Sequence, residues 1–583
     1  MIKTLARSLR EHKKGSILTI FLSILEAAFE ILIPLCMADI IDKGIDLGDM
    51  GAVWKYGIAL LIFAALQLFT GVLSAHIAAK TSVGFSANLR QDMYDNVQTF
   101  AFSNIDKFST ASIVTRLTTD VTNIQNSYQM LIRMAIRGPI MLIFSMAVSF
   151  SISSSIAWIF LAIIPVMAAL LLLIVRSVHP VFSRVFRTYD QLNNVVQENI
   201  RGIRVVKSFN QEDYEIKKFK GISKDIYNDF AKGERLLAFN SPIMQFFMYA
   251  CMILISWIGA KAIVASGNNA ALGMTTGDLT AMFAYAMQIL MSLMALSMVF
   301  AMMTISLASA RRIAEILDEK TDIANPDQPE MTVKDGAICF EGVDFVYASK
   351  ADKKVLDNVN LSIASGETVG IIGGTGSSKS SLVQLIPRLY DVTGGRLMLG
   401  GIDVRNYDLT VLRNAVAMVL QKNELFSGTI KDNLRWGNEN ATDAEIEHVC
   451  RLACADEFIQ GFPNKYDTYI EQGGTNVSGG QKQRLCIARA LLKKPKVLIL
   501  DDSTSAVDTK TDASIQKAFA QHIPDITKII IAQRISSVQH ADQIIVLDDG
   551  KVVAVGKHAE LLQNCAIYRE VYVSQQKGGE EHE

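Results

Sequence analysis

The chain is 583 residues long, which exceeds what one hydrophobic core organises and predicts at least two domains. A formal net charge of −1 excludes the basic excess of a nucleic-acid-binding protein, so we expect no nucleic-acid partner. Hydrophobic residues make up 50% of the sequence and charged residues 20%. Because the apolar runs are concentrated in residues 16–303, we expect a membrane-embedded half and, over residues 337–575, a water-soluble half.

Six apolar runs in the first half are long enough to cross a lipid bilayer, whose core of about 30 Å requires about 20 residues of helix. Lys and Arg are frequent in the N-terminal segment and in segments 80–130 and 177–240, and rare between the other spans. The positive-inside rule therefore predicts that both termini lie in the cytoplasm. The six runs cover residues 17–38, 53–75, 138–152 (extended backward to about 130), 156–176, 242–264 and 280–303.

The first span carries two carboxylates, Glu26 and Glu30, which are four residues apart and share one helix face. Carboxylates inside a membrane are costly and usually face a partner or a water-filled cavity. Two interpretations stay open. The pair is a substrate site for cationic cargo or a proton-linked step, or it consists of protonated or hydrogen-bonded acids that hold helices together.

Two segments predict helices that continue far beyond the membrane. Between Val53 and Ser103 there is no Pro and there are only three Gly, so we expect a nearly continuous helix about 75 Å long. Segment 181–240 has the same character. Each segment contains a polar break where the chain can turn back, at 103–106 and at 210–213. We hypothesise that these two turns press on the domain that follows the spans.

A charged, Pro-containing linker over residues 318–336 separates the two halves. We therefore place a transmembrane domain at 1–317, a second domain at 337–575 and a polar tail at 576–583. In the second domain short β-rich runs alternate with helical patterns, which is typical of an α/β domain.

A phosphate-binding loop follows the apolar strand at 367–372 and precedes a helix. Glycines let backbone N–H groups close around phosphate oxygens, Lys379 reaches the terminal phosphates, and Ser380 can ligate Mg²⁺. Ser378 stands where the pattern G-x₄-G-K-[ST] has its last Gly. The expected ATP cradle consists of Gly373, Gly374, Thr375, Gly376, Ser377, Ser378, Lys379, Ser380 and Ser381.

Three further residues are candidates for the same site. Tyr347 ends a strand, and its ring could stack on adenine. Gln421 follows another apolar strand and is placed as a sensor near Mg²⁺. Asp501 ends the strand VLILD, where an Asp typically holds Mg²⁺ through water. ATP and Mg²⁺ are the predicted cofactors.

The run Ser478, Gly479, Gly480, Gln481 opens a helix and offers exposed glycine amides as a second anion site. A domain with a cradle at one place and this run at another can bind ATP between two such domains, each completing the other's site.

Together these motifs resemble those of ATP-binding-cassette (ABC) exporters with fused membrane and nucleotide-binding domains. Tyr347 resembles the adenine-stacking tyrosine, GGTGSSKS the Walker A loop, Gln421 the Q-loop glutamine, and VSGGQ the signature. VLILD resembles the Walker B strand and SAVD (505–508) the D-loop. The resemblance implies six helices with long cytoplasmic extensions, a P-loop ATPase domain, and a dimeric pump with two ATP molecules sandwiched head to tail.

Two positions depart from this family. The general-base Glu is replaced by Asp502 and the switch His by Gln533. An Asp side chain is shorter by one C–C bond, about 1.5 Å, and Gln does not titrate as His does. The pattern is similar to the degenerate-site subunit of heterodimeric bacterial multidrug exporters. It implies a homologous partner subunit, slow turnover at this chain's own Walker site, and residence in a bacterial plasma membrane.

The leading hypothesis is therefore one subunit of a heterodimeric exporter for small amphipathic or drug-like compounds. A homodimeric lipid or peptide exporter, with Asp502 as a slow base, is the alternative within transport. An ATP-gated membrane regulator or channel is the alternative from another class. The intact SGGQ run and the two cytoplasmic turns favour transport over gating.

Overall fold

The computed structural model of the protein describes residues 1–269, 271–347, 353–502 and 507–580. The chain divides into two compact units. The first unit contains Met1–Gln98 and Ser109–Glu319, and the second contains Thr99–Phe108 and Lys320–Glu583.

The described residues of the first unit form helices joined by turns. Within the described residues, six stretches are long and apolar enough to cross a membrane, as the sequence predicted: Arg10–Ile45, Met50–Gln98, Thr110–Ile152, Ser154–Arg201, Glu212–Ser266 and Thr276–Asp318. Its elements are α1 (Ile2–Arg7), η1 (Arg10–His12), α2 (Lys13–Asp39), η2 (Ile40–Ile45), α3 (Met50–Gln98), α5 (Thr110–Thr115), η3 (Arg116–Asp120), α6 (Val121–Ile152), α7 (Ser154–Arg201), α8 (Ile203–Ser208), α9 (Glu212–Leu237), α10 (Asn240–Ser266) and α11 (Thr276–Asp318).

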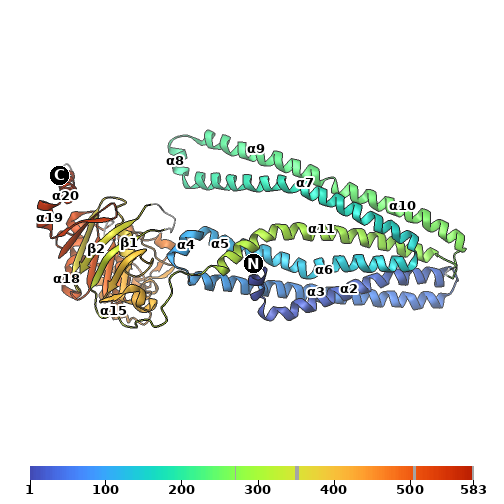
Figure 1. Ribbon diagram of the computed structural model, residues 1–583, viewed down its shortest axis with the longest axis horizontal. Helices are drawn as coiled ribbons and strands as arrows, with labels where there is room; N and C mark the ends of the chain where they lie inside the picture. Colours follow the sequence, from blue (N-terminus) through green and yellow to red (C-terminus); the bar gives the residue numbers. More distant parts are fainter. Residues whose placement is uncertain (270, 348–352, 503–506, 581–583) are drawn as a thin grey trace. The chain divides into compact units, whose positions relative to one another are not determined.

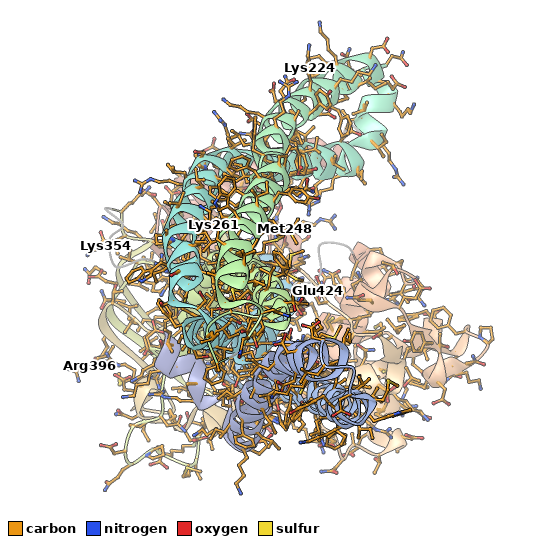
Figure 2. All side chains as sticks on the ribbon, turned by 90° about the vertical axis from the view of Figure 1, so that its right-hand side faces the viewer. Lys224, Met248, Lys261, Lys354, Arg396 and Glu424 are labelled. Atoms are coloured by element: carbon orange, nitrogen blue, oxygen red, sulfur yellow. The ribbon has the colours of Figure 1, made fainter. Side chains whose placement is uncertain are left out.

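Long extensions of the helices are present as predicted. Helix α3 has 49 residues, which correspond to about 74 Å and are more than twice a membrane core. Helices α7 and α9 run side by side to the short helix α8, which connects them (Figure 1). The reversal occurs just after α8, where Asn210 has a φ of 50°, in the polar break predicted at 210–213. Figure 2 shows the polar side chains of α9, such as Lys224, projecting outward from this arm.

Helices α2, α6, α10 and α11 enclose an apolar core that includes Ile31, Met141, Ile255 and Tyr285. Tyr285 is fully buried, and its hydroxyl donates a hydrogen bond of 2.8 Å to the carbonyl of Ile31. This bond links α11 to α2 inside the core and satisfies the buried Tyr285 hydroxyl.

The second unit is an α/β structure built on two main sheets. The larger sheet has the order β12-β11-β3-β10-β9-β6, parallel except for the β11–β12 pair, and the smaller one is the antiparallel sheet β2-β1-β4-β5. The strands are β1 (Ile338–Phe345), β2 (Leu356–Ile363), β3 (Thr368–Gly373), β4 (Gly394–Leu399), β5 (Ile402–Asp403), β6 (Val416–Val419), β7 (Gly428–Thr429), β8 (Tyr469–Ile470), β9 (Val497–Asp501), β10 (Thr527–Ile531), β11 (Gln543–Asp548) and β12 (Lys551–Gly556).

The larger sheet separates two hydrophobic cores. Along β9, Leu498 and Leu500 belong to one core, and Val497 and Ile499 to the other, because side chains alternate across a strand. The helices of this unit are α4 (Phe102–Phe108), α12 (Lys379–Gln384), α13 (Leu409–Ala415), α14 (Ile430–Arg435), α15 (Asp443–Leu452), α16 (Asp456–Gln460), α17 (Gly479–Leu492), α18 (Thr509–His522), α19 (His558–Asn564) and α20 (Ala566–Glu580).

Helix α4 contains the first predicted turn and belongs to the second unit. The hydroxyl of Tyr390 donates a hydrogen bond of 2.8 Å to Asp106, and the Tyr390 ring lies 6.0 Å from that of Phe102. Ser103 donates to Asp322 at 2.9 Å. The hypothesised contact of this turn with the second domain is therefore present, whereas the turn at 210–213 lies in the first unit and its contact stays a hypothesis.

Candidate functional site

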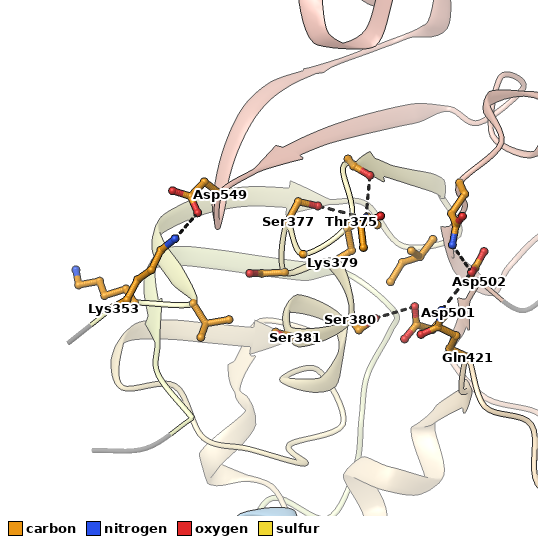
Figure 3. A pocket seen from close by; sticks show the side chains of 17 residues that line it. Lys353, Thr375, Ser377, Lys379, Ser380, Ser381, Gln421, Asp501, Asp502 and Asp549 are labelled. Carbon is orange, nitrogen blue, oxygen red and sulfur yellow. Dashed lines mark hydrogen bonds and ion pairs between the residues drawn. The ribbon is translucent and has the colours of Figure 1, made fainter. Parts of the chain in front are cut away.

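A cavity of ≈ 540 Å³ lies where the parallel strands β3, β9 and β10 end (Figure 3). This position follows from the register, since Ile531 pairs with Asp501 on one side and with Ile371 on the other, so that the loops after the strands converge. The volume is that of a small-molecule site. The cavity is lined by Lys353, Lys354, Val355, Gly373, Thr375, Gly376, Ser377, Ser378, Lys379, Ser380, Ser381, Gln421, Asp501, Asp502, Ile531, Gln533 and Asp549.

The loop after β3 has the backbone of a phosphate cradle. Gly376 adopts a φ of 82°, and a Cβ atom added to Gly374 or Gly376 would meet nothing within 4 Å. A φ of this size is one that glycine adopts without strain, which explains the glycine at position 376. Ser378 also adopts a left-handed backbone, with a φ of 71°. The backbone at this position therefore keeps the left-handed conformation typical of the motif's Gly, although the residue is Ser. A Ser side chain makes this conformation strained.

We predict that Ser378→Gly stabilises the second unit. A non-Gly residue in the left-handed region costs about 1–2 kcal/mol, so removing the Cβ should raise the unfolding free energy by up to about 1 kcal/mol after the larger chain entropy of Gly is subtracted. Thermal unfolding with and without ATP measures this. The matched control is Ser377→Gly, because the neighbouring Ser377 does not have a left-handed backbone. Equal or lower stability of Ser378→Gly than of the parent would contradict the strain argument.

Lys379 begins α12 and turns back over the loop. Its Nζ donates to the carbonyls of Gly373 (2.9 Å) and Gly374 (2.8 Å) and to Ser377 Oγ (3.2 Å). Burial lowers the pKa of this amine below its ordinary value, while the charges of Asp501 and Asp502 oppose that shift. A phosphate group in the loop would supply the counter-charge that the ammonium lacks among these neutral oxygens.

Ser380 and Asp501 form the polar pair opposite Lys379 (Figure 3). Ser380 Oγ donates to Asp501 Oδ1 at 3.1 Å, and Asp501 is only 3% exposed. Burial raises the pKa of Asp501, the charge of Asp502 raises it further, and the Ser380 hydrogen bond and Lys379 oppose this. A hydroxyl and a buried carboxylate beside a phosphate cradle fit Mg²⁺, which takes one or two protein oxygens in addition to phosphate oxygens.

Asp502 and Gln533, the two departures from the family pattern, are bonded to each other. Gln533 Nε2 donates to Asp502 Oδ2 at 2.7 Å, and Gln421 Nε2 approaches the same oxygen at 3.4 Å. Asp502 is 8% exposed and has a φ of 48°, a left-handed conformation for a non-Gly residue. Its carboxylate therefore meets two neutral amide donors, and the side chain lines the cavity (Figure 3).

Tyr347 lies beside the cavity rather than in its lining. Its hydroxyl shares a hydrogen bond of 2.7 Å with Ser381 Oγ, and its ring packs edge-on against Phe345 and Tyr390. The side chain is 45% exposed, which leaves a ring face available for stacking on a base.

The signature run caps helix α17. Ser478 Oγ accepts a hydrogen bond from the N–H of Gln481, and the Gln481 side chain accepts one from the N–H of Ser478 at 2.9 Å, which is a capping box. Ser478 and Gly479 are exposed. None of the four signature residues is among the described residues that line the cavity, so this run does not contribute to the chain's own cradle. Of the predicted D-loop SAVD, Ser505 and Ala506 lie outside the described residues.

Sequence reasoning missed several cavity residues. Lys353 and Lys354 precede β2, and Asp549 follows β11, where Lys353 Nζ lies 2.8 Å from its carboxylate. Two adjacent lysines near the end of the Tyr347 strand were the only sequence signal for them. Val355 and Ile531 belong to strands or their flanks and carried none.

The two carboxylates of the first span, Glu26 and Glu30, lie next to an arginine that the sequence analysis did not identify. Arg137 of α6 donates to Glu30 Oε2, and its Nη2 lies 3.8 Å from Glu26 Oε1. Glu26 is 6% exposed. An interaction that links two helices, as one of the two interpretations of this pair expected, is therefore present. It joins the two carboxylates of α2 to an arginine of α6.

Comparisons with known proteins agree with this geometry. Two family models match the chain, the ABC transporter transmembrane region over residues 16–310 and the ABC transporter model over residues 356–505. The uncharacterized ABC transporter ATP-binding protein YfiB of Bacillus subtilis (strain 168) is 36% identical over 561 residues, which are 96% of either protein. The ATP-dependent lipid A-core flippase of Desulfotalea psychrophila is 30% identical over 577 residues, which are 98% of this chain and 99% of that protein.

One solved structure shares the fold over almost the whole length. It is a bacterial Atm1-family ABC exporter with ATP bound, with a TM-score of 0.82 and 23% sequence identity, and the match covers 97% of this chain and 99% of that one.

Proposed function

This chain belongs to the ABC exporters that join a transmembrane domain and an ATPase domain in one polypeptide, and we propose that it is one half of a heterodimer. In this proposal its own Walker site binds ATP and turns it over slowly, and most hydrolysis occurs at the site that the partner supplies. The observation that carries the proposal is the Asp502–Gln533 hydrogen bond at the place where the family has its base and its switch.

The residues predicted from the sequence have the following roles in ATP binding under this proposal. The loop Gly373–Ser378 presents backbone N–H groups to the phosphates, and Lys379 transfers its hydrogen bonds from the loop carbonyls to phosphate oxygens. Ser380, Asp501 and Gln421 would hold Mg²⁺ directly or through water, and Tyr347 would stack on the adenine. Mg²⁺ supplies positive charge next to the phosphates when it is bound.

Slow ATP hydrolysis is expected because the Asp502 carboxylate is too short to contact the attacking water. A general base must lie within hydrogen-bond reach of the attacking water, and a carboxylate set back by about 1.5 Å loses that contact. Gln533 is a neutral amide, and in this structure it donates to Asp502. The pair therefore supports ATP retention rather than cleavage.

The exposed signature supports the other half of the proposal. Ser478, Gly479, Gly480 and Gln481 leave their own cavity free, and in a head-to-tail dimer they would close the partner's Walker site. This chain would then contribute to efficient hydrolysis without performing it.

The arrangement in the cell extends the same proposal. We place residues 1–317 in the transmembrane domain, 318–336 in the linker and 337–575 in the nucleotide-binding domain, with both termini in the cytoplasm of a bacterial cell. The proposed cargo is small and amphipathic, with Glu26 and Glu30 near its path. A homodimeric lipid exporter is the second candidate, favoured by the likeness to a lipid A-core flippase.

The test is ATP hydrolysis and dye transport by the purified chain, alone and together with a co-expressed homologous half-transporter. We expect low ATPase activity from the chain alone, and ATP-dependent uptake of an amphipathic dye into inverted vesicles only when both chains are present. The matched control replaces Lys379 in this chain by Ala. Vigorous ATPase activity of the chain without any partner would overturn the heterodimer, and dye movement without ATP hydrolysis would favour a gated channel.

A further inference from the structure

A groove in the first unit contains a buried carboxylate oxygen with no partner. Glu26 Oε2 is buried and makes no hydrogen bond within the part of the chain that the structure describes. The other oxygen, Oε1, lies 3.8 Å from Arg137. An ionised oxygen left in this state inside a membrane protein is costly, and such a group marks a ligand or ion site.

The groove next to this oxygen has a volume of ≈ 470 Å³ and is formed mainly by one face of α3. Gly71 gives access to the carboxylate, because a Cβ atom there would lie 3.1 Å from Glu26 Oε1 and 3.7 Å from Oε2. Leu68 and Val72, on the same face, are 69% and 62% exposed and form an apolar wall. The groove therefore joins a buried carboxyl group to an apolar surface.

A positive charge stands at the same groove. Arg133 of α6 lines it, and within the described residues no carboxylate lies within ion-pair distance of this arginine. Arg137, one helical turn further along α6, is already bonded to Glu30. The groove thus presents one acceptor atom, Glu26 Oε2, that makes no hydrogen bond, and one cation, Arg133, that makes no ion pair within the described residues.

We propose that this groove binds the head of a zwitterionic amphiphile, with a protonated primary amine at Glu26 and a phosphate at Arg133. The apolar tails then lie along Leu68 and Val72, at a depth where α3 crosses the membrane. Charge complementarity selects this occupant, since a purely cationic ligand leaves Arg133 unpaired and a purely anionic one leaves Glu26 unpaired. The inference rests on the proposed function, whose cargo class it narrows to amphiphiles with an aminophosphate head.

The test is lipid retention by the full chain in detergent, measured by native mass spectrometry. The probes are phosphatidylethanolamine, phosphatidylcholine and phosphatidylglycerol with identical acyl chains. Only the first has both an N–H donor and a phosphate. We expect it to be retained about tenfold more tightly than the other two, because charge-assisted hydrogen bonds are the strong ones.

Two substitutions separate the two ends of the site. Glu26→Gln should remove the preference for phosphatidylethanolamine and leave the other two lipids unchanged, whereas Arg133→Gln should weaken all three lipids by a similar factor. The matched controls are Glu198→Gln and Arg201→Gln, both on the exposed end of α7. Gly71→Leu is a second variant that keeps both charges and fills the groove, so a loss of binding there is independent of the folding of the charge variants.

Equal retention of the three lipids by the parent chain would overturn the inference, as would a preference that survives both Glu26→Gln and Gly71→Leu. If the preference disappears when the homologous partner is bound, the groove is a subunit interface and the inference also fails. Lipid retention is measured without ATP. Its result therefore does not affect the ATPase and dye experiments, which test the proposed function separately.

Discussion

The double variant Asp502→Glu/Gln533→His is expected to hydrolyse ATP about 100-fold faster than the parent at the pocket around Lys379, because a misplacement of about 1 Å costs rates of this order. Glu restores the reach of the carboxylate by one C–C bond. His replaces the amide that now donates to Asp502 at 2.7 Å. The measurement is single-turnover hydrolysis of ATP by the chain assembled with a partner whose own base has been removed.

The two single variants separate the effect of the length of the acidic side chain from the effect of the residue at position 533. Asp502→Glu alone should regain only part of the rate, because Gln533 and Gln421 still meet the carboxylate with neutral amides. Gln533→His alone should change little, because the short carboxylate still fails to reach the water. Asp542→Glu is the matched control, an Asp outside the cavity lining. A parent chain that already hydrolyses at the rate of the double variant would show that Asp502 is a competent base.

Much of this site was predictable because its residues come in local patterns. The strand, loop and helix around Lys379 are contiguous, so their order alone indicates a cradle, and Asp501 ends a strand of five apolar or acidic residues that is buried throughout. Likewise, the long Pro-free stretch from Val53 became the single helix α3. In these cases local propensity and tertiary structure agree.

Other features depend on long-range pairing and left no local signal. Arg137 bonds to Glu30 from a position 107 residues away, and Lys353 reaches Asp549 across 196 residues. The Asp502–Gln533 bond joins the ends of β9 and β10, and it needed the parallel register of those strands. The identities of Asp502 and Gln533 predicted a weakened site, whereas the direct bond between them appears only once the strands are placed side by side.

In the proposed heterodimer, a substitution in the signature should reduce total ATP turnover far more than one at the chain's own base position. Gly479→Asp places a carboxylate at the anion site, and loss of one donor to developing charge typically costs about 100-fold or more in rate. The helix itself should survive, because an Asp in the first turn is favourable and the Ser478–Gln481 capping box is kept. Asp502→Asn, in contrast, should change total turnover little, since under the proposal the chain's own site contributes little of it.

The unequal effect of Gly479→Asp and Asp502→Asn distinguishes a heterodimer from a homodimer. In a homodimer both pockets contain Asp502 and both are closed by Ser478–Gln481, so the two substitutions would lower turnover together. Steady-state ATPase assays of the two variants, each co-purified with the same partner, make the comparison directly. Gly461→Asp, in a turn outside the signature, is the matched control for an added carboxylate. Comparable losses in Gly479→Asp and Asp502→Asn would mean that this chain breaks ATP as effectively as its partner, because only a working base makes the second substitution costly.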